Sequence, residues 1–171
     1  MANHPAEKGL IILNVRIALP PPGHPKAPPG VVSSWLFSLK PDDPVVVSGP
    51  YGHFFVEPSD REAVFIGGGA GMAPLRAQIL DLLETQQTKR KISFWYGARS
   101  RRELYYAEVF ECLQDEHSNF SWHPALSESE TVDAWEGHTG YIHQIVFDQY
   151  LMQHASPERC EYYLCGPPLM V

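Results

Sequence analysis

Four glycines gather within five residues, at positions 67, 68, 69 and 71 of the stretch VFIGGGAGMAPLR. Glycine permits backbone angles and close approaches that other residues exclude, so such a run suits a strand that turns sharply into a helix. The exposed amides at the start of that helix attract an anion, typically a pyrophosphate. We therefore expect a dinucleotide-binding turn here rather than a merely tight one. Its candidate residues are Gly67, Gly68, Gly69, Ala70, Gly71, Met72, Ala73 and Pro74.

This turn departs from the usual dinucleotide fingerprint. In G-x-G-x-x-G counted from Gly67, the third glycine is replaced by Met72. The acidic residue expected after the next strand is also missing, because that end reads Gly97, Ala98, Arg99. No G-K-[ST] follows, which excludes a P-loop. The pattern indicates a dinucleotide turn of a different lineage.

The elements that must position this turn alternate between strand and helix from residue 61 onward. Apolar runs predict strands, and the stripe of Leu75, Ile79, Leu82 and Leu83 predicts a helix. Such alternation implies a parallel sheet that binds ligands beyond its carboxyl strand ends. The expected strands are 63–68, 91–98, 120–126 and 160–168, and the expected helices are 74–87, 102–116 and 141–154.

Residues 1–60 have a different composition. The stretches LIILNVRIAL (10–19) and PVVVSGPYG (44–52) predict strands, and residues 31–40 predict a short helix after a proline-rich loop. These pieces suggest part of a small antiparallel β-barrel. We therefore expect an α/β chain with one domain over 1–60 and a second, parallel-sheet domain over 61–171.

Composition excludes several classes of function. The formal net charge of −7 disfavours nucleic acid as a partner. Three cysteines are too few for a disulfide scaffold and fit no zinc spacing, and the eight histidines are scattered, so no metal site is expected. No apolar window of about 18 residues predicts a membrane span.

The motifs GGGAGMAPLR, FWYGARS and CGPPLM, in this order, resemble the pyridine-nucleotide domain of the ferredoxin–NADP reductase superfamily. With PPGVVSSWLFSLKP and SGPYGHFF, the chain is similar almost segment for segment to the family of F subunits of Na⁺-translocating NADH:quinone reductases. The resemblance implies a ferredoxin-reductase-like fold. It also implies hydride transfer from NADH to FAD, with electrons passed through a 2Fe–2S cluster towards quinone. The partners it implies are the other subunits of a complex at the cytoplasmic face of the bacterial inner membrane.

The resemblance also implies roles for particular residues. A G-x-x-S turn before a helix would bind the FAD pyrophosphate, and here it comprises Gly30, Val31, Val32, Ser33 and Ser34. The end of the second strand, near the adenosine, comprises Gly97, Ala98, Arg99 and Ser100. The turn beside the nicotinamide comprises Cys165, Gly166, Pro167 and Pro168. We assign Cys165 to positioning, since hydride transfer needs no nucleophile.

Charge after the third strand favours NADH over NADPH. NADPH-using relatives place a Ser-Arg pair there to hold the 2′-phosphate, whereas this chain has Ser127 and Glu128, followed closely by Glu130. Carboxylates would repel that phosphate. Arg99, Arg101 and Arg102 act in the opposite direction, since one of them could approach a 2′-phosphate.

Relative to that family, the chain is expected to be a fragment that is itself soluble. It begins after the flavin motif R-x-Y-S and lacks the membrane helix, the 2Fe–2S domain, the first barrel strands and the C-terminal tail. FAD retention is therefore expected to be weak. Two alternatives stay open: the reductase component of a multicomponent oxygenase, and a dinucleotide-binding module without redox activity of its own.

Overall fold

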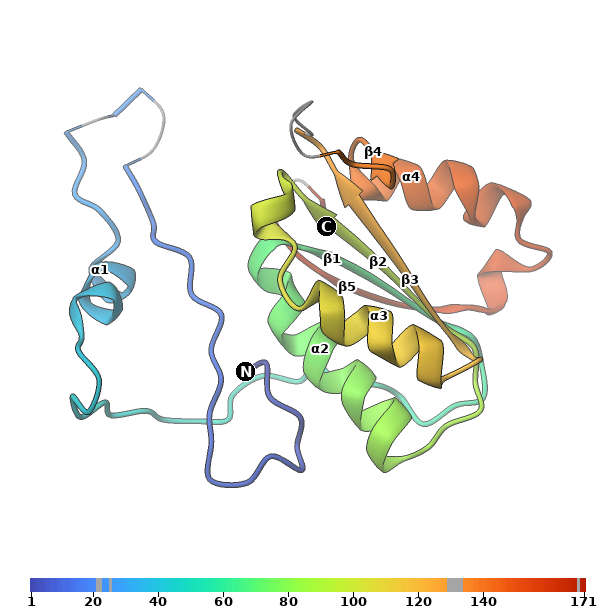
Figure 1. The fold of residues 1–171 in the computed structure, drawn as a ribbon, viewed down its shortest axis with the longest axis horizontal. Helices are drawn as coiled ribbons and strands as arrows, with labels where there is room; N and C mark the ends of the chain where they lie inside the picture. The colour runs from blue at the N-terminus through green and yellow to red at the C-terminus, as the bar shows by residue number, and fades with distance from the viewer. Residues whose placement is uncertain (21–22, 25, 129–133, 169) are drawn as a thin grey trace. The chain divides into compact units, whose positions relative to one another are not determined.

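The computed structural model describes residues 1–20, 23–24, 26–128, 134–168 and 170–171 (Figure 1). The chain divides into two units. Met1–Leu13 and Phe55–Val171 form the larger unit, and Asn14–Phe54 form the smaller one. The larger unit holds the parallel sheet and the predicted dinucleotide turn.

Five parallel strands make up the sheet, in the order β4-β3-β2-β1-β5. Every residue of β1 is buried, as expected for a central strand covered on both faces. It pairs with β2 on one side and with β5 on the other. The strand bounds are β1 Ala63–Gly68, β2 Ile92–Ala98, β3 Phe120–Leu126, β4 His138–Thr139 and β5 Glu161–Cys165.

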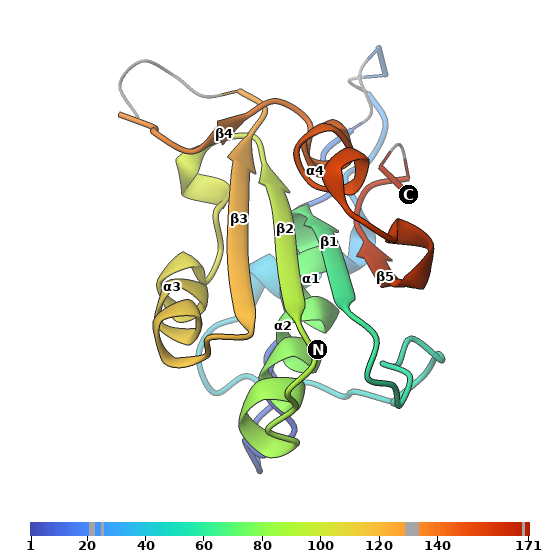
Figure 2. The same ribbon diagram turned by 90° about the vertical axis from the view of Figure 1, so that its right-hand side faces the viewer.

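Helices cover both faces of the sheet (Figures 1 and 2). Helices α2 (Met72–Leu80) and α3 (Ala107–Glu116) lie on one face, where Phe65 and Phe94 pack among Ile79 and Phe110. Helix α4 (Ile142–Gln149) covers the opposite face. Alternate residues of the same strands, such as Trp95, pack there in a second apolar cluster with the helix. The larger unit is thus a three-layer α/β/α arrangement, which confirms the predicted parallel-sheet class.

Short helical turns extend or precede the main helices. Helix α2 continues as a wider π-helical turn over Asp81–Thr85. The 3₁₀ turns comprise Gly69–Gly71, Arg101–Glu103, Leu151–Gln153 and Pro157–Arg159.

Several predicted boundaries are wrong. The helix expected over 141–154 ends at Gln149, and the strand expected over 160–168 ends at Cys165. The start of α3 also differs from the prediction. The helix expected to begin at residue 102 begins instead at Ala107, after the 3₁₀ turn over Arg101–Glu103. Tyr106 has a φ of 59°, in the left-handed region, and a residue in this conformation cannot continue a right-handed helix. A side-chain pattern does not reveal such a break, because Leu104 and Tyr106 both pack against the core as helical residues would.

The two strands predicted within residues 1–60 are also wrong. Residues 10–19 and 44–52 form no strand, and the smaller unit's one helix is α1 (Val31–Ser38), among the residues that the structure describes. A strand is defined by its hydrogen-bonded neighbour, and neither stretch pairs with another strand here. Their composition favours strands, but composition alone does not supply the pairing partner that a strand needs.

Candidate functional site

The two sequence motifs that predicted a nicotinamide site meet at one edge of the sheet. The chain leaves β1 towards β2 on one side, whereas β5 lies on the other side, so the strand order reverses between β1 and β5. The glycine turn follows β1 and Cys165 ends β5, with Gly67 and Cys165 paired in register. Figure 2 shows these strands running parallel, with their carboxyl ends at the same edge. Open α/β sheets bind ligands at this kind of switch point.

Two of the turn's glycines are required by packing. A Cβ atom added at Gly71 would lie 1.9 Å from the Cys165 carbonyl oxygen, so the start of α2 can approach β5 only without a side chain there. A Cβ atom added at Gly67 would lie 2.9 Å from Leu75 and 3.1 Å from the Tyr96 ring. These glycines bring the two turns together and leave no open space of their own.

Gly69 differs, because its missing side chain faces open space. Its φ is +53° and an added Cβ atom would meet nothing within 4 Å. Beside it, a Cβ atom on Gly68 would meet the Met170 sulfur at 2.9 Å and Pro167 at 3.2 Å. The Met170 sulfur lies near the end of a flexible side chain, so it can move when a ligand approaches. The turn thus leaves open space beside Gly69, directly before the first amides of α2.

Tyr96 fixes the position of this turn, although the sequence assigns it no role within the FWYGARS motif. It is fully buried in β2, and its hydroxyl group donates a hydrogen bond to the Gly69 carbonyl oxygen at 2.9 Å. The same hydroxyl group lies 3.3 Å from the carbonyl oxygen of Glu103. Burial raises the pKa of Tyr96, so it stays a neutral donor at any physiological pH. A tyrosine within an apolar strand resembles an ordinary core residue until its partner is known.

Cys165 ends β5 beside the glycine turn. It is half-buried and packs against the core cluster on the α2 and α3 face. Burial raises the pKa of the Cys165 thiol, so the group is neutral at pH 7. A neutral thiol has the properties of a small positioning group rather than those of an activated nucleophile.

The end of β2 lies next to the glycine turn, because β2 pairs with β1 up to Gly97. A Cβ atom on Gly97 would lie 3.0 Å from Ile142, so this glycine admits the first turn of α4. Arg99 is exposed and forms an ion pair with Glu103. The hydrogen bond and charge of Glu103 raise the pKa of Arg99, and Glu128 adds to this effect.

Backbone hydrogen bonds place Glu128 beside this strand end. The Ser127 amide donates to the Ala98 carbonyl oxygen, and the Glu128 amide donates to that of Arg99, each at 2.9 Å. Two carboxylates therefore lie near the single guanidinium of Arg99. Glu130 and Leu169, which also belong to the sequence motifs, lie outside the described residues.

The predicted flavin segment lies in the smaller unit. The Ser33 hydroxyl group donates to the Gly30 carbonyl oxygen and accepts from the Ala18 amide, each at 3.1 Å. Gly30 is also required by packing, since an added Cβ atom would lie 2.6 Å from that of Ala18. Val31 and Val32, whose amides begin α1, are exposed. The hydroxyl group of Ser33 is thus used by the chain itself, and only backbone amides remain as candidate anion-binding groups of this segment.

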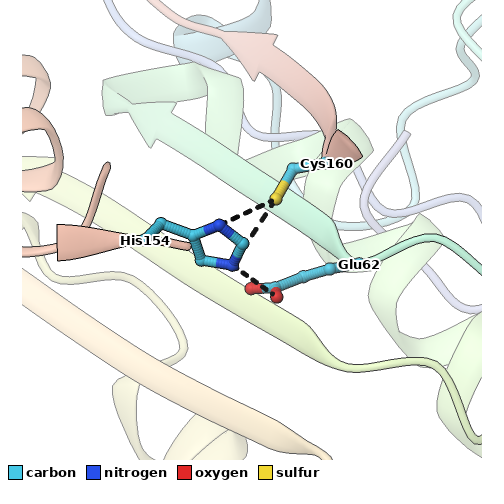
Figure 3. Close-up of side chains that lie close together, drawn as sticks. All are labelled: Glu62, His154 and Cys160. Atoms are coloured by element: carbon cyan, nitrogen blue, oxygen red, sulfur yellow. Dashed lines mark hydrogen bonds and ion pairs between the residues drawn. The ribbon is translucent and has the colours of Figure 1, made fainter. Parts of the chain in front are cut away.

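A third group of polar residues gathers at the opposite edge of the sheet. Glu62 precedes β1, Cys160 precedes β5 and His154 lies in the connection from α4 (Figure 3). The sequence predicts no metal site and does not identify these three residues as a group. Only the pairing of β1 with β5 makes Glu62 and Cys160 neighbours, and no spacing in the sequence reveals it.

Comparison with known proteins identifies the family. A family model described as the oxidoreductase NAD-binding domain matches residues 65–171. The chain belongs to this family. The match begins within β1 and includes both turns at the switch point. An oxidoreductase NAD-binding domain therefore occupies most of the larger unit.

Individual relatives agree with this assignment. The chain is 59% identical over 170 residues to the F subunit of the Na⁺-translocating NADH-quinone reductase of Yersinia pestis (strain Pestoides F), and the match covers 99% of the chain and 42% of the relative. The chain thus spans less than half the length of the curated relatives it matches. Among solved structures, the cytochrome b5 reductase domain of Ulva prolifera nitrate reductase is similar with a TM-score of 0.72 and 23% identity. That similarity covers 91% of this chain and 61% of the other, and it confirms the ferredoxin-reductase-like fold.

A reductase from an oxygenase system is more distant in sequence. The ferredoxin reductase in carbazole 1,9a-dioxygenase has a TM-score of 0.61 and 29% identity, covering 82% of this chain and 41% of the other. The higher identity to the Yersinia F subunit does not favour the oxygenase alternative. Within the described part of the chain, no helix has the length and apolar character needed to span a membrane.

Proposed function

We propose that this chain binds NADH at the switch point between β1 and β5, as the NADH-binding part of a flavin-dependent oxidoreductase. The observation that carries the proposal is the juxtaposition of the two turns, in which Gly69 alone combines a left-handed φ with open space. Family membership and the 59% identity to the Yersinia F subunit support it. By the same similarity, we propose the type of enzyme to be the electron-input subunit of a Na⁺-translocating NADH:quinone reductase.

The residues of the two turns would hold the dinucleotide. The amides of Gly69 to Ala73 lie in the 3₁₀ turn and at the start of α2, where the positive end of the helix dipole favours a diphosphate. The segment Gly97–Ser100 would lie near the adenosine, and Cys165–Pro168 near the nicotinamide. Bound NADH supplies a hydride, which a flavin can accept. The chain's own contribution is orientation, because the neutral Cys165 thiol and the buried Tyr96 neither donate nor accept a proton at pH 7.

We propose that NADH is preferred over NADPH because of the charges around Arg99. Glu103 already forms an ion pair with Arg99. The charge of Glu128 also contributes to the raised pKa of Arg99. A 2′-phosphate approaching this strand end would compete with one carboxylate and be repelled by the other. Glu128→Gln should therefore narrow the difference in affinity between NADH and NADPH. Glu136→Gln should leave it unchanged, because Glu136 is exposed and is not among the carboxylates that raise the pKa of Arg99.

We propose that the chain binds FAD but retains it only weakly. The amides of Val31 and Val32 at the start of α1 can attract a phosphate, but no described residue of the smaller unit forms a strand that could complete a flavin pocket. A purified protein that retains stoichiometric FAD would contradict this proposal. The 2Fe–2S cluster, the partner subunits and the location at the cytoplasmic face of the inner membrane are inferred from the relatives alone.

Titration of the 171-residue chain with NADH and NADPH tests the central proposal, with Gly69→Ala as the decisive variant. The left-handed φ strains an alanine by about 1–2 kcal/mol, but the added methyl group meets no atom, so the protein should still fold while its NADH affinity falls at least about tenfold. Gly9→Ala is the matched control, because Gly9 has a φ of +77° and also faces open space. Equal NADH affinity in the Gly69→Ala variant and the parent chain would overturn the proposed site.

Ferricyanide reduction with added FAD then separates the two remaining functions. Turnover of NADH supports a flavin reductase. Saturable NADH binding without turnover would favour the alternative, a dinucleotide-binding module without redox activity of its own.

A further inference from the structure

Glu62, Cys160 and His154 form a cluster at the amino-terminal edge of the sheet. Ala63 pairs with Glu161 in the parallel register, and the Glu161 amide donates to the Glu62 carbonyl oxygen at 2.8 Å. The residues directly before β1 and β5 are therefore neighbours. The glycine turn lies at the other end of the same strands, about 20 Å away for a six-residue strand. The cluster is thus separate from the proposed NADH site and independent of that proposal.

The three donor atoms have the spacing of metal ligands. His154 Nε2 lies 3.1 Å from Glu62 Oε2 and 3.8 Å from Cys160 Sγ (Figure 3). One ligand atom from each residue lies within 4.8 Å of the other two. Tetrahedral zinc with ordinary bond lengths requires about 3.3 Å between nitrogen and oxygen ligands and about 3.6 Å between nitrogen and sulfur ligands. Small side-chain rotations would bring all three atoms onto one ion.

A cavity provides room for a further ligand. Its volume is about 430 Å³, and its lining includes the three cluster residues together with Asp60, Ser156 and Arg159. Cys160 is buried, and the Glu62 side chain is 14% exposed. Water can enter from the cavity, while the three protein donors are held on the wall. Three protein ligands with an open fourth position are a common arrangement for protein-bound zinc.

Neighbouring residues orient the Glu62 carboxylate. The Tyr150 hydroxyl group donates to Oε1, and Lys91 Nζ lies 3.4 Å from the same oxygen. This leaves Oε2 facing His154. Lys91 also hydrogen-bonds to Tyr150 at 2.7 Å, so its charge is held on the side of Glu62 away from the histidine contact. Outer contacts of this kind orient the ligands of metal sites.

The geometry disfavours a nucleophilic triad made from the same three residues. In such a triad, the histidine contacts the nucleophile through one ring nitrogen and the carboxylate through the other. Here the Cys160 sulfur lies 3.8 Å from Nε2 and 4.0 Å from Nδ1, so it faces neither nitrogen alone, and Glu62 contacts Nε2 as well. Nδ1 instead accepts a hydrogen bond from the Ser156 amide at 3.2 Å. Burial also raises the pKa of the Cys160 thiol, which opposes its activation.

We propose that Glu62, His154 and Cys160 bind a divalent cation of the zinc class, with water as the fourth ligand. A thiolate and an imidazole select zinc or cobalt over magnesium and calcium. Binding releases the Cys160 thiol proton to solvent. It also moves the imidazole proton from Nε2 to Nδ1, so the Ser156 amide loses its acceptor and must turn away from the new Nδ1–H group. Thiolate and carboxylate together balance the two charges of the ion.

Such an ion would tie together three segments of the larger unit: the start of β1, the start of β5 and the connection from α4. Because the site requires their folded arrangement, binding should stabilise the folded state. Zinc should therefore raise the melting temperature of the full chain by several degrees, and magnesium should not.

Cobalt provides the direct test, since Co²⁺ bound to a thiolate gives a charge-transfer band and tetrahedral Co²⁺ gives intense d–d bands. A second cluster comprises the exposed Glu84 and Glu116 and the partly buried His117, and the Cys112 thiol donates a hydrogen bond to Glu116 there. The titration is therefore made in the Cys112→Ser background, which removes the exposed thiol and is expected to keep the band. We expect one equivalent of Co²⁺ to produce both features.

The ligand variants then locate the ion. Cys160→Ser should abolish the charge-transfer band, and His154→Gln and Glu62→Gln should each lower the Co²⁺ affinity at least about tenfold. Circular dichroism checks that each variant is folded. A band that persists in Cys160→Ser, or no band in the Cys112→Ser background at saturating Co²⁺, overturns the proposal.

A measurement on the unsubstituted chain remains decisive if a ligand variant fails to fold. Zinc should slow alkylation of Cys160, measured by mass spectrometry of its peptide, and should leave the alkylation rate of Cys165 unchanged. Equal alkylation rates of Cys160 with and without zinc would overturn the proposal.

Discussion

Tyr96 connects the core of the sheet to the turn proposed to bind NADH. Its phenol ring is fully buried, and its hydroxyl group holds the Gly69 carbonyl oxygen. The turn contains several glycines, so its conformation depends on such external contacts more than on its own side chains. A single buried hydrogen bond therefore affects both folding and the shape of the site.

We expect Tyr96→Phe to lower the free energy of unfolding by about 1 kcal/mol and to weaken NADH binding several-fold, because Gly69 loses its anchor. Urea denaturation and NADH titration measure the two effects. Tyr163→Phe is the matched control, since it loses a comparable hydrogen bond to Glu161 at 2.8 Å. The control should lose stability and keep its NADH affinity. Unchanged NADH affinity in Tyr96→Phe would show that the anchor has no part in binding.

His123 is an internal titrating group on the α4 face of the sheet. Its ring stacks on Trp95 with a centroid distance of 4.0 Å. Burial, with smaller contributions from the charges of His138 and Lys91, lowers the pKa of His123 to about 4. The unfolded chain therefore binds a proton on this histidine near pH 6.5, where the folded chain does not.

The contribution of the neutral His123 to the free energy of unfolding should be fully present above pH 6.5. It should be lost as the pH falls from 6.5 towards 4. The fall in pKa from 6.5 to about 4 corresponds to at most about 3–4 kcal/mol, at about 1.4 kcal/mol per pKa unit, and partial exposure reduces it. Only part of this loss has occurred at about pH 5. Urea denaturation at about pH 7.5 and about pH 5, with chelator present, measures it. His123→Phe keeps the ring and should reduce the pH dependence, whereas His143→Phe on the exposed side of α4 should not. Equal pH dependence in His123→Phe and the parent chain would contradict the assignment.

At the scale of elements, Arg90 joins the amino-terminal ends of several strands. The buried guanidinium contacts Glu161 Oε2 at 2.7 Å and the Arg61 carbonyl oxygen at 2.6 Å. The Arg90 carbonyl oxygen accepts from the Asn119 side chain at 2.8 Å. Arg90, which precedes β2, thus contacts the segments at which β1, β3 and β5 begin.

Arg90→Met should destabilise the larger unit by about 3–5 kcal/mol, because it leaves Glu161 and backbone carbonyl groups without their buried partner. Lys89→Met removes the same charge from an exposed neighbouring side chain and should change stability by less than about 0.5 kcal/mol. Urea denaturation compares the two variants. If Arg90→Met lowered the free energy of unfolding no more than the control does, the contacts of Arg90 would contribute little to stability.

The strands and helices of residues 63–165 were largely predictable, because long apolar runs such as that of β1 identify buried strands. The errors occur where a partner or a backbone angle decides. Residues 10–19 have the composition of a strand and no ladder, and the left-handed Tyr106 delays α3. The two-residue strand β4 is too short to give a pattern.

The candidate sites show the same division. Local motifs identified both turns of the proposed NADH site, since each is contiguous in sequence. They did not reveal which glycines pack and which face open space, because Leu75, Tyr96 and the Cys165 carbonyl group decide that from elsewhere in the fold. The cluster of Glu62, His154 and Cys160 depends on strand pairing across about a hundred residues, so no local pattern contains it.

At the scale of the whole molecule, the two units differ in how their residues are buried. Helix α1 of the smaller unit has no buried residue, whereas α2 of the larger unit has six. Local stability follows burial and hydrogen bonding. The two units should therefore differ in how often they open.

Hydrogen exchange measured by mass spectrometry should show this difference. Amides of α1 and of residues 44–52 should exchange quickly, and those of α2 and β1 slowly. The two helices form a matched pair, since both have backbone hydrogen bonds and differ in burial. Strong protection in residues 44–52 would contradict the unpaired backbone of that stretch.

The position of β5 at one end of the strand order has a consequence for handling the protein. Among the described residues, β5 pairs with β1 and with no strand on its other side, and Tyr162 and Leu164 are partly exposed along it. The unpaired side of an edge strand can pair with a strand of another molecule. The protein should therefore self-associate through β5 at high concentration. Tyr162→Lys would place a gatekeeper charge against this association, and light scattering at increasing concentration would show its effect.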